Sequence, residues 1–96
     1  MPNRTYRRGR AREYRVMRAL EKTGYHCVRA AGSKGLFDIV AICKEGIRLI
    51  QVKLNKGPTA EERKALSVFS NLPSNAVKEV WTFKDRCEPT VQRIGG

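Results

Sequence analysis

Apolar residues follow a helical spacing at the start of the chain. From about Thr5 to Thr23 they recur every three or four positions, and arginines occupy many of the positions between them. This spacing predicts an amphipathic helix. Gly24 is expected to end it, because glycine readily adopts the left-handed conformation that closes many helices. The apolar positions are Ala11, Tyr14, Val16, Met17 and Leu20.

The pattern then changes to that of strands. Residues 25–30 are predicted to form a short first strand. The stretch from Gly32 to Lys56 contains a glycine loop, an apolar strand, a tight turn at Glu45-Gly46 and a second apolar strand. The loop, Ala31 to Gly35, places glycines around a serine and a lysine. It suits either a close approach to phosphate or ordinary turn chemistry.

A second helix follows a break in the pattern at residues 55–58. Thr59 to Glu62 is a capping box, which marks the first turn of a helix, and Pro73 is expected to end it. Residues 76–83 then have the character of a strand, and residues 90–94 could form a last short one.

This order of elements favours one fold class. A helix, three strands, a helix and one or two further strands predict a small α/β domain with a mixed central sheet flanked by helices. We expect residues 1–96 to form a single domain, with residues 1–4 as a flexible lead-in.

Three polar residues interrupt the apolar strands of the hairpin. Asp38 lies in the first strand, and Gln51 and Lys53 lie in the second. An ionised group on a core strand is costly unless another group pairs with it. A shared functional site would explain all three residues, and a structural ion pair between Asp38 and Lys53 is the alternative.

The hairpin turn determines how these residues face one another. A two-residue or a four-residue loop centred on Glu45-Gly46 gives the same register, with Asp38 opposite Lys53 and Val40 opposite Gln51. Directly opposed residues of an antiparallel pair point the same way, with Cβ atoms about 5 Å apart. We therefore expect Asp38, Gln51 and Lys53 to converge on one patch of the sheet.

The charge balance indicates a polyanionic partner. The formal net charge is +11, and residues 1–30 carry nine Lys or Arg against two Glu. A basic stripe of this kind most often binds nucleic acid. Glu13 is the exception within it and lies at the edge of the apolar stripe. It is either part of a site or a surface glutamate paired with Arg10 or Arg18.

Other residue classes limit the possibilities further. Cys27, Cys43 and Cys87 lack the spacing of a zinc site, and His26 has no second histidine at ligand spacing. No apolar run approaches a membrane span, and the first residues carry no apolar signal segment. We expect a cytoplasmic protein without membrane contact and without a nucleotide cofactor.

The chain resembles the PD-(D/E)XK nuclease superfamily, and within it the archaeal-type and phage Holliday junction resolvases. The resemblance covers roughly residues 6 to 56 and rests on Arg8-Gly9 followed by Glu13, on Gly32-Ser33, on Phe37-Asp38 and on Gln51-Val52-Lys53. It implies a restriction-endonuclease-like core and a Mg²⁺-dependent, structure-selective DNA endonuclease. Such an enzyme resolves four-way junctions by paired phosphodiester cleavage.

The resemblance also implies a metal site. Asp38 and Gln51 would hold Mg²⁺, with Mn²⁺ as a possible substitute, and the Val52 backbone carbonyl offers another oxygen ligand. Glu13 would assist the metal shell, and Lys53 would activate or orient the attacking water. Gln51 is a departure, because the resolvase pattern has glutamate there. A neutral ligand should weaken metal affinity and make Glu13 more important.

The resemblance further implies contacts with DNA and with a second copy of the chain. Ser33 would lie near the scissile phosphate, and a homodimer would match the two-fold symmetry of a four-way junction. The residues expected to contact phosphates are Arg7, Arg8, Arg10, Arg12, Lys34 and Lys56. The residues expected to divide between core and dimer interface are Leu66, Phe69, Val80, Trp81 and Phe83.

The sequence leaves three alternatives open. The first is another nuclease of the same superfamily, of restriction or nicking type. The second is a catalytically impaired DNA-binding module, with Gln51 marking the loss of metal binding. The third is a basic RNA- or ribosome-associated protein in which Asp38 and Lys53 form a structural ion pair.

Overall fold

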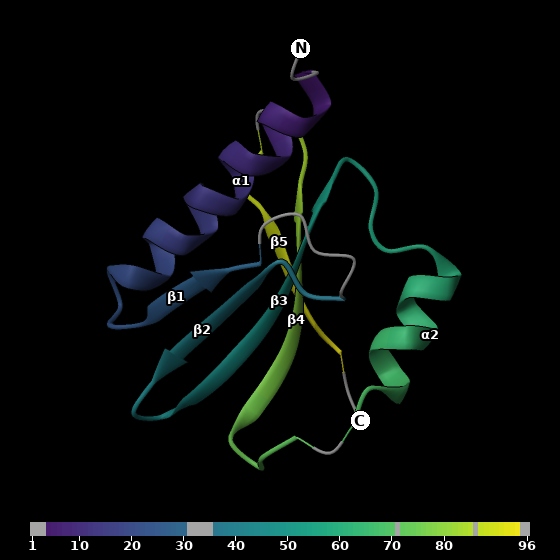
Figure 1. Cartoon of the computed structure of the whole chain (residues 1–96). Coiled ribbons are helices and arrows are strands. Elements are labelled where there is room, and N and C mark those ends of the chain that lie inside the picture. Colours follow the sequence, from purple (N-terminus) through teal and green to yellow (C-terminus); the bar gives the residue numbers. More distant parts are fainter. Residues whose placement is uncertain (1–3, 31–35, 71, 86, 95–96) are drawn as a thin grey trace.

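In the described part of the chain, five strands form one mixed sheet and two helices lie against it (Figure 1). The computed structural model describes residues 4–30, 36–70, 72–85 and 87–94, with the side chains of the first helix described from Arg10 onward. The predicted fold class is confirmed. The elements in chain order are α1 (Arg4–Glu21), β1 (His26–Arg29), β2 (Ile39–Cys43), β3 (Gly46–Leu54), α2 (Ala60–Val68), β4 (Ala76–Phe83) and β5 (Thr90–Ile94).

The strands lie side by side in chain order, from β1 to β5. All neighbours are antiparallel except β3 and β4, which run parallel. Parallel neighbours need a crossover connection, and here α2 lies within it. The end of β3, which carries the candidate residues Gln51 and Lys53, therefore leads directly toward the first turn of α2.

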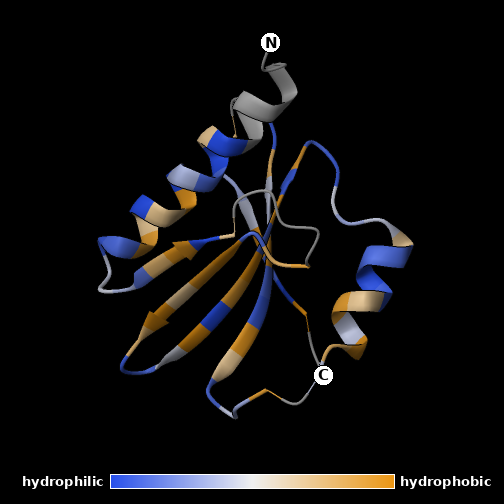
Figure 2. Ribbon diagram, in the orientation of Figure 1, coloured by the Kyte–Doolittle hydropathy of each residue, from blue (hydrophilic) through white to orange (hydrophobic). Residues whose placement is uncertain are grey.

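The two faces of the sheet differ in what covers them. One face carries the main core together with the apolar side of α1. The other face carries α2, whose Leu66 is fully buried, and Val80 of β4 is also buried. Figure 2 shows hydrophobic residues along the middle of the strands and along one stripe of α1. The buried members of the main core are Val16, Leu20, Ile39, Ala41, Ile50, Trp81 and Phe83.

The end of α1 and the start of α2 have the capping contacts that the sequence predicts. After α1, the Tyr25 N–H donates to the Leu20 carbonyl at 3.2 Å and the Gly24 N–H to the Glu21 carbonyl at 3.1 Å, which is the Schellman pattern. Gly24 has a φ of 97°, which suits glycine. At α2, Thr59 and Glu62 form the predicted capping box. The helix ends at Val68, earlier than expected from Pro73.

Arg4 already belongs to α1, contrary to the expectation that residues 1–4 form a flexible lead-in. Residues 1–3 lie outside the described part of the chain. No helix in the described part is long and apolar enough to cross a membrane.

The predicted register of the β2–β3 hairpin is wrong by two residues. Cys43 pairs with Gly46, so the turn consists of Lys44 and Glu45. Gly46 is a strand residue, and a Cβ there would collide with the Asn75 carbonyl oxygen. Glycine is therefore required by this close approach and not by the turn. A shift of two residues leaves every side chain on its predicted face, because the faces alternate with a period of two.

The apolar set assigned to core and interface lies mostly in the core. Leu66, Val80, Trp81 and Phe83 are buried within the chain itself. Phe69 is 39% exposed and packs edge-on against Phe37, with ring centroids 5.3 Å apart.

Candidate functional site

Asp38 lies immediately before β2, where β3 continues beyond its neighbour. Its N–H donates to the Ile50 carbonyl at 2.8 Å, and its Oδ2 accepts the Val52 N–H at 2.8 Å. The Asp38 carboxylate thus accepts the hydrogen bond that a backbone carbonyl would accept if the β2–β3 ladder continued by one more step. Because the N–H and C=O of a strand residue point to the same edge, the Val52 carbonyl lies on the Asp38 side.

Gln51 faces Asp38, one step beyond the Ile39–Ile50 pair of the ladder. Its side chain is nearly buried, with the residue 6% exposed, and its Nε2 donates to the Leu36 carbonyl at 3.1 Å. This contact fixes the orientation of the amide. Oε1 has no hydrogen-bond partner among the described residues, although it is buried. Buried polar atoms without partners are uncommon, and one beside a carboxylate is consistent with a missing ligand.

Lys53 follows on the same face of β3 and points toward α2. Its Nζ lies 2.5 Å from Glu62 Oε2. The ion pair of Lys53 is therefore formed with Glu62 and not with Asp38. The predicted convergence of Asp38, Gln51 and Lys53 on one face is observed, but the predicted opposition of Asp38 to Lys53 is not.

Glu13 reaches the same region from α1. It lines a pocket of about 390 Å³ together with Val52, Lys53, Lys56 and Glu62. Its Oε1 accepts a hydrogen bond from Arg29 Nη1 at 3.0 Å, and both side chains are largely buried. Arg29, on β1, thus replaces Arg10 and Arg18, the partners expected if Glu13 were a surface residue.

The electrostatics of the site follow from burial and from the Lys53–Glu62 pair. Burial raises the pKa of Asp38, and the bond from Val52 and the charge of Lys53 only partly offset this effect. The charge of Glu62 also raises it, so Glu62 acts on Asp38 electrostatically. The bond from Lys53, followed by the bond from the Thr59 backbone, holds the pKa of Glu62 below its usual range.

The predicted phosphate-contacting residues are only partly described. Arg10 is exposed and lies over the Tyr14 ring, and Arg12 lies over the Phe83 ring. Lys56 is exposed and is one of the residues that line the Glu13 pocket. The loop residues Ser33 and Lys34 lie outside the described residues, as do the side chains of Arg7 and Arg8.

Two charged partners in the site were not predicted. The sequence indicates a capping role for Glu62 and a strand position for Arg29, but it does not indicate that either side chain reaches the site. The capping box was the available signal for Glu62, since it places a carboxylate at the start of a helix that follows β3 directly. Within the described ranges, no three His, Cys, Asp or Glu side chains gather closely enough to hold a metal. Of the three residues whose oxygens are candidate metal ligands, Asp38, Gln51 and Val52, only Asp38 belongs to these four residue types.

Comparison with known proteins identifies the family. The family model of the archaeal Holliday junction resolvase (Hjc) matches residues 4–69, which is more than half of the chain. The chain belongs to the Hjc family. This family is one of Holliday junction resolvases, so the chain is a member of a nuclease family associated with DNA recombination and repair.

Solved structures agree with this fold. Among eight matching chains is the 1.6 Å structure of Hjc from Archaeoglobus fulgidus, a Holliday junction resolvase from an archaeal hyperthermophile. The two chains share 24% sequence identity with a TM-score of 0.73, over 91% of this chain and 73% of the other. At this identity the match supports the Hjc fold alone. The search of curated proteins gives no significant match.

Proposed function

We propose that this Hjc-family chain is a Mg²⁺-dependent endodeoxyribonuclease that resolves four-way DNA junctions by paired phosphodiester cleavage. The observation that carries the proposal is that the Asp38 carboxylate, which accepts the Val52 N–H, lies across the ladder from Gln51, whose buried Oε1 has no hydrogen-bond partner among the described residues. A DNA recombination intermediate as substrate would place the protein in the compartment that holds the DNA.

The residues present fit a magnesium ion. Mg²⁺ prefers oxygen ligands and usually takes one or two carboxylates, with water and substrate phosphate completing its shell. Asp38, Gln51 Oε1 and the Val52 carbonyl would hold it, and Mn²⁺ could take its place because it accepts similar ligands. When bound, such an ion polarises the phosphodiester and lowers the pKa of coordinated water.

The remaining residues of the site would bind and orient the reactants. Lys53 would stabilise the negative charge that develops on the phosphate, or orient the attacking water. Glu13, held by Arg29, would add negative charge at the same edge and offset the neutral Gln51. Ser33 would lie near the scissile phosphate. The expected products carry a 5′-phosphate and a 3′-hydroxyl.

Basic residues around the site would hold the DNA backbone. Arg10, Arg12 and Lys56 would contact phosphates, together with Arg7, Arg8 and Lys34. Such contacts position DNA without reading its sequence, and they make binding strongly dependent on salt. This behaviour suits a substrate that is recognised by the shape of its branch point.

Cleavage of a labelled four-way junction, beside a linear duplex of the same sequence, tests the proposal. We expect paired cuts in the junction alone, with Mg²⁺ and not with Ca²⁺ or EDTA. Gln51→Glu restores a second carboxylate and is expected to cut faster at limiting Mg²⁺. Junction binding without cutting by either protein would favour an impaired binding module, and absence of both binding and cutting would exclude a junction resolvase.

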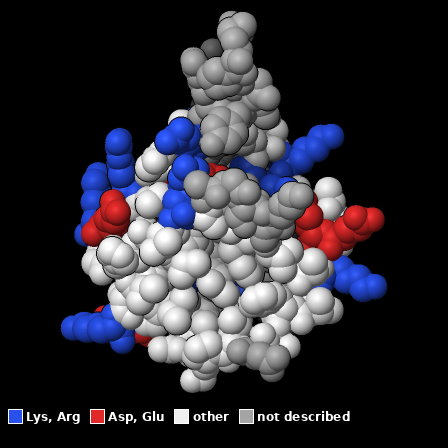
Figure 3. Space-filling model, in the orientation of Figure 1, with Lys and Arg blue, Asp and Glu red and all other residues white. Residues whose placement is uncertain are grey.

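We also propose a homodimer, formed through the uncovered part of the sheet face that carries Asp38 and Gln51. Val28 and Ile42 are 50% and 43% exposed there, beside the half-buried Val40, Ile47 and Leu49. Figure 3 shows a broad surface without charged side chains on this side of the molecule, with charges along its rim. A second copy of the chain suits this face, because a two-fold contact would bury its apolar residues. The same symmetry would give the dimer two equivalent sites, one for each of the two DNA strands to be cut.

Ile42→Glu tests this interface. A buried charge without a partner opposes association. We therefore expect the wild-type chain to have the mass of a dimer in sedimentation equilibrium, and the variant that of a monomer. Val91→Glu is the matched control, because Val91 is 45% exposed on the opposite face of the sheet. A monomeric wild type, or an Ile42→Glu variant that remains dimeric, would contradict this assignment.

A further inference from the structure

We propose that Glu62 is a positioning residue that fixes the ammonium group of Lys53 at the site. This inference rests on the proposed nuclease function and adds to it a residue outside the Asp38, Gln51, Lys53 and Glu13 set. It is carried by the 2.5 Å contact between Lys53 Nζ and Glu62 Oε2, where the side chains are 25% and 31% exposed.

Glu62 is itself held in place by both parts of the capping box. Its Oε1 accepts the Thr59 backbone N–H at 2.9 Å, and its own N–H donates to Thr59 Oγ1 at 3.1 Å. One carboxylate oxygen is thus bound to the helix terminus, and the other faces Lys53. A carboxylate in the first turn is also favoured by the helix dipole. Glu62 is therefore a fixed acceptor rather than a mobile surface side chain.

Lys53 needs such an acceptor because of its chemistry. A lysine ammonium group sits on a flexible four-carbon stem and samples many rotamers unless something holds it. Lys53 projects from the same sheet face as Gln51 and Asp38, and it lines the pocket that also contains Glu13 and Glu62. Glu62 keeps the ammonium group at this pocket, where a phosphate of the DNA would meet it.

The position of α2 makes this contact possible. The chain leaves β3 after Leu54 and returns as α2 within six residues, so the first turn of the helix lies beside the end of the strand. The charge of Glu62 also acts on Asp38, consistent with one compact group of charges.

The opposite role for Glu62 is to sequester Lys53 and so restrain the reaction. The two roles predict opposite effects on the cleavage rate when the charge of Glu62 is removed.

Glu62→Gln separates these roles without removing the cap, since glutamine also completes a capping box. We expect the single-turnover rate of junction cleavage to fall by about 10- to 100-fold, the scale of a displacement of roughly 1 Å in an active site. The dissociation constant for the junction in Ca²⁺ should stay close to that of the wild type. Glu61→Gln is the matched control, because it removes an exposed carboxylate from the same helical turn. We expect its rate to match the wild type.

A second measurement tests the contact without relying on cleavage. The ¹H–¹⁵N correlation spectrum of lysine ammonium groups detects those whose protons exchange slowly with water, as they do in a fixed ion pair. We expect a Lys53 signal in the wild type and in Glu61→Gln, and its loss in Glu62→Gln. The signal is assigned by its absence in Lys53→Arg.

The outcomes distinguish this inference from the proposed function. If the wild type and Gln51→Glu both fail to cut, the nuclease proposal fails and the positioning role fails with it. If the wild type cuts and Glu62→Gln cuts equally fast or faster, the positioning role alone is overturned. Loss of rate with unchanged junction binding, together with loss of the Lys53 signal, supports it.

Discussion

Asp38→Asn is expected to abolish junction cleavage and leave the chain folded. The carboxylate is the only ionised oxygen ligand in the proposed set of Asp38, Gln51 and Val52, because Gln51 is neutral. Even outer-shell partners of metal ligands are worth about 10- to 100-fold in activity, so loss of this ligand should cost more than about 100-fold. Single-turnover cleavage of a labelled junction in Mg²⁺ measures the effect.

The fold should tolerate this substitution because asparagine also carries an acceptor oxygen for the Val52 N–H. Burial raises the pKa of Asp38, so the ionised carboxylate is disfavoured in the folded chain, and the neutral amide removes that cost. Urea unfolding in EDTA should therefore show stability at least equal to that of the wild type. Glu45→Gln, at the distant turn of the hairpin, is the control for activity. An Asp38→Asn variant that unfolds early would instead indicate a structural role.

The elements of the fold could be predicted because each carries its own local signals. Gly24 ends α1 and Thr59 begins α2, and both act through contacts within a few residues of themselves. Local signals of this kind do not depend on the rest of the fold. The strand 76–83 was predicted with the bounds that the structure shows.

The register of the hairpin could not be predicted, because its cause lies far away in the sequence. Gly46 packs against Asn75, which precedes β4, and the Ile47 N–H donates to the Asn75 carbonyl at 3.1 Å. From the sequence alone, glycine beside Glu45 indicates a turn. The grouping of Asp38 with Gln51 was nevertheless predicted correctly, since it depends only on which face each residue occupies.

The charged partners of the site were missed for a related reason. Glu62 and Arg29 acquire their roles from packing, because one requires α2 beside β3 and the other requires β1 beside α1. Buried charges on β4 were also missed. Lys78 is 6% exposed and donates to the Leu66 and Phe69 carbonyls at 2.6 and 2.8 Å, so it closes the end of α2. A pattern of apolar positions contains no information about such partners.

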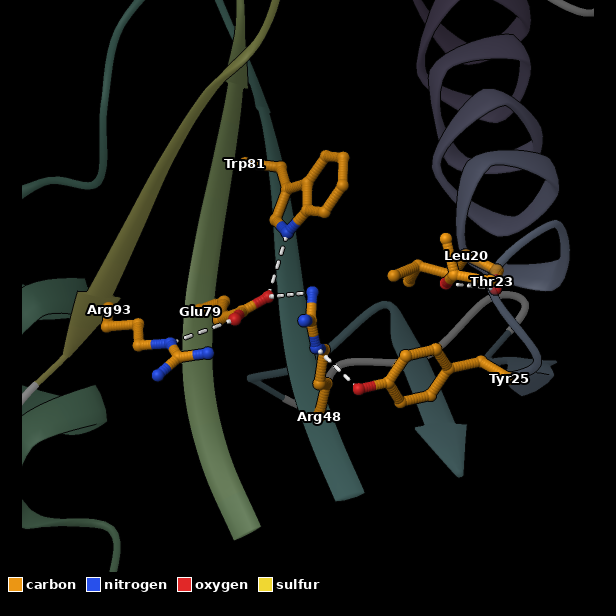
Figure 4. Close-up of polar contacts among 7 residues, drawn as sticks. All are labelled: Leu20, Thr23, Tyr25, Arg48, Glu79, Trp81 and Arg93. Atoms are coloured by element: carbon orange, nitrogen blue, oxygen red, sulfur yellow. Dashed lines mark hydrogen bonds and ion pairs between the residues drawn. The ribbon is translucent and has the colours of Figure 1, made fainter. Parts of the chain in front are cut away.

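Glu79→Ala is expected to produce the largest loss of stability. Glu79 is 1% exposed on β4, and its carboxylate accepts the Trp81 indole N–H at 3.1 Å and Arg93 Nε at 3.3 Å (Figure 4). Arg48 Nη1 lies 3.6 Å away and its Nε donates to the Tyr25 hydroxyl at 3.1 Å. Removal of the carboxylate would leave the buried indole N–H of Trp81 without its acceptor and the largely buried guanidinium of Arg48 without its ion-pair partner.

The expected cost is about 3–5 kcal/mol in the free energy of unfolding, as for other buried ion pairs that lose one partner. Domains of this kind are stable by only about 5–15 kcal/mol, so the variant should be close to unfolding near 37 °C. Urea denaturation followed by Trp81 fluorescence measures the loss, and calorimetry should show a melting temperature lower by roughly 4–8 °C for each kcal/mol.

Glu88→Ala is the matched control for this experiment. Glu88 also pairs with an arginine, Arg15, at 4.0 Å, but its side chain is 92% exposed and that of Arg15 is 55% exposed. Exposed pairs contribute little, so this variant should stay within about 0.5 kcal/mol of the wild type. Equal midpoints for the two variants would show that the Glu79 cluster adds no stability. A large difference would show that burial, and not the pairing of charges alone, makes this strand sensitive to the loss of one carboxylate.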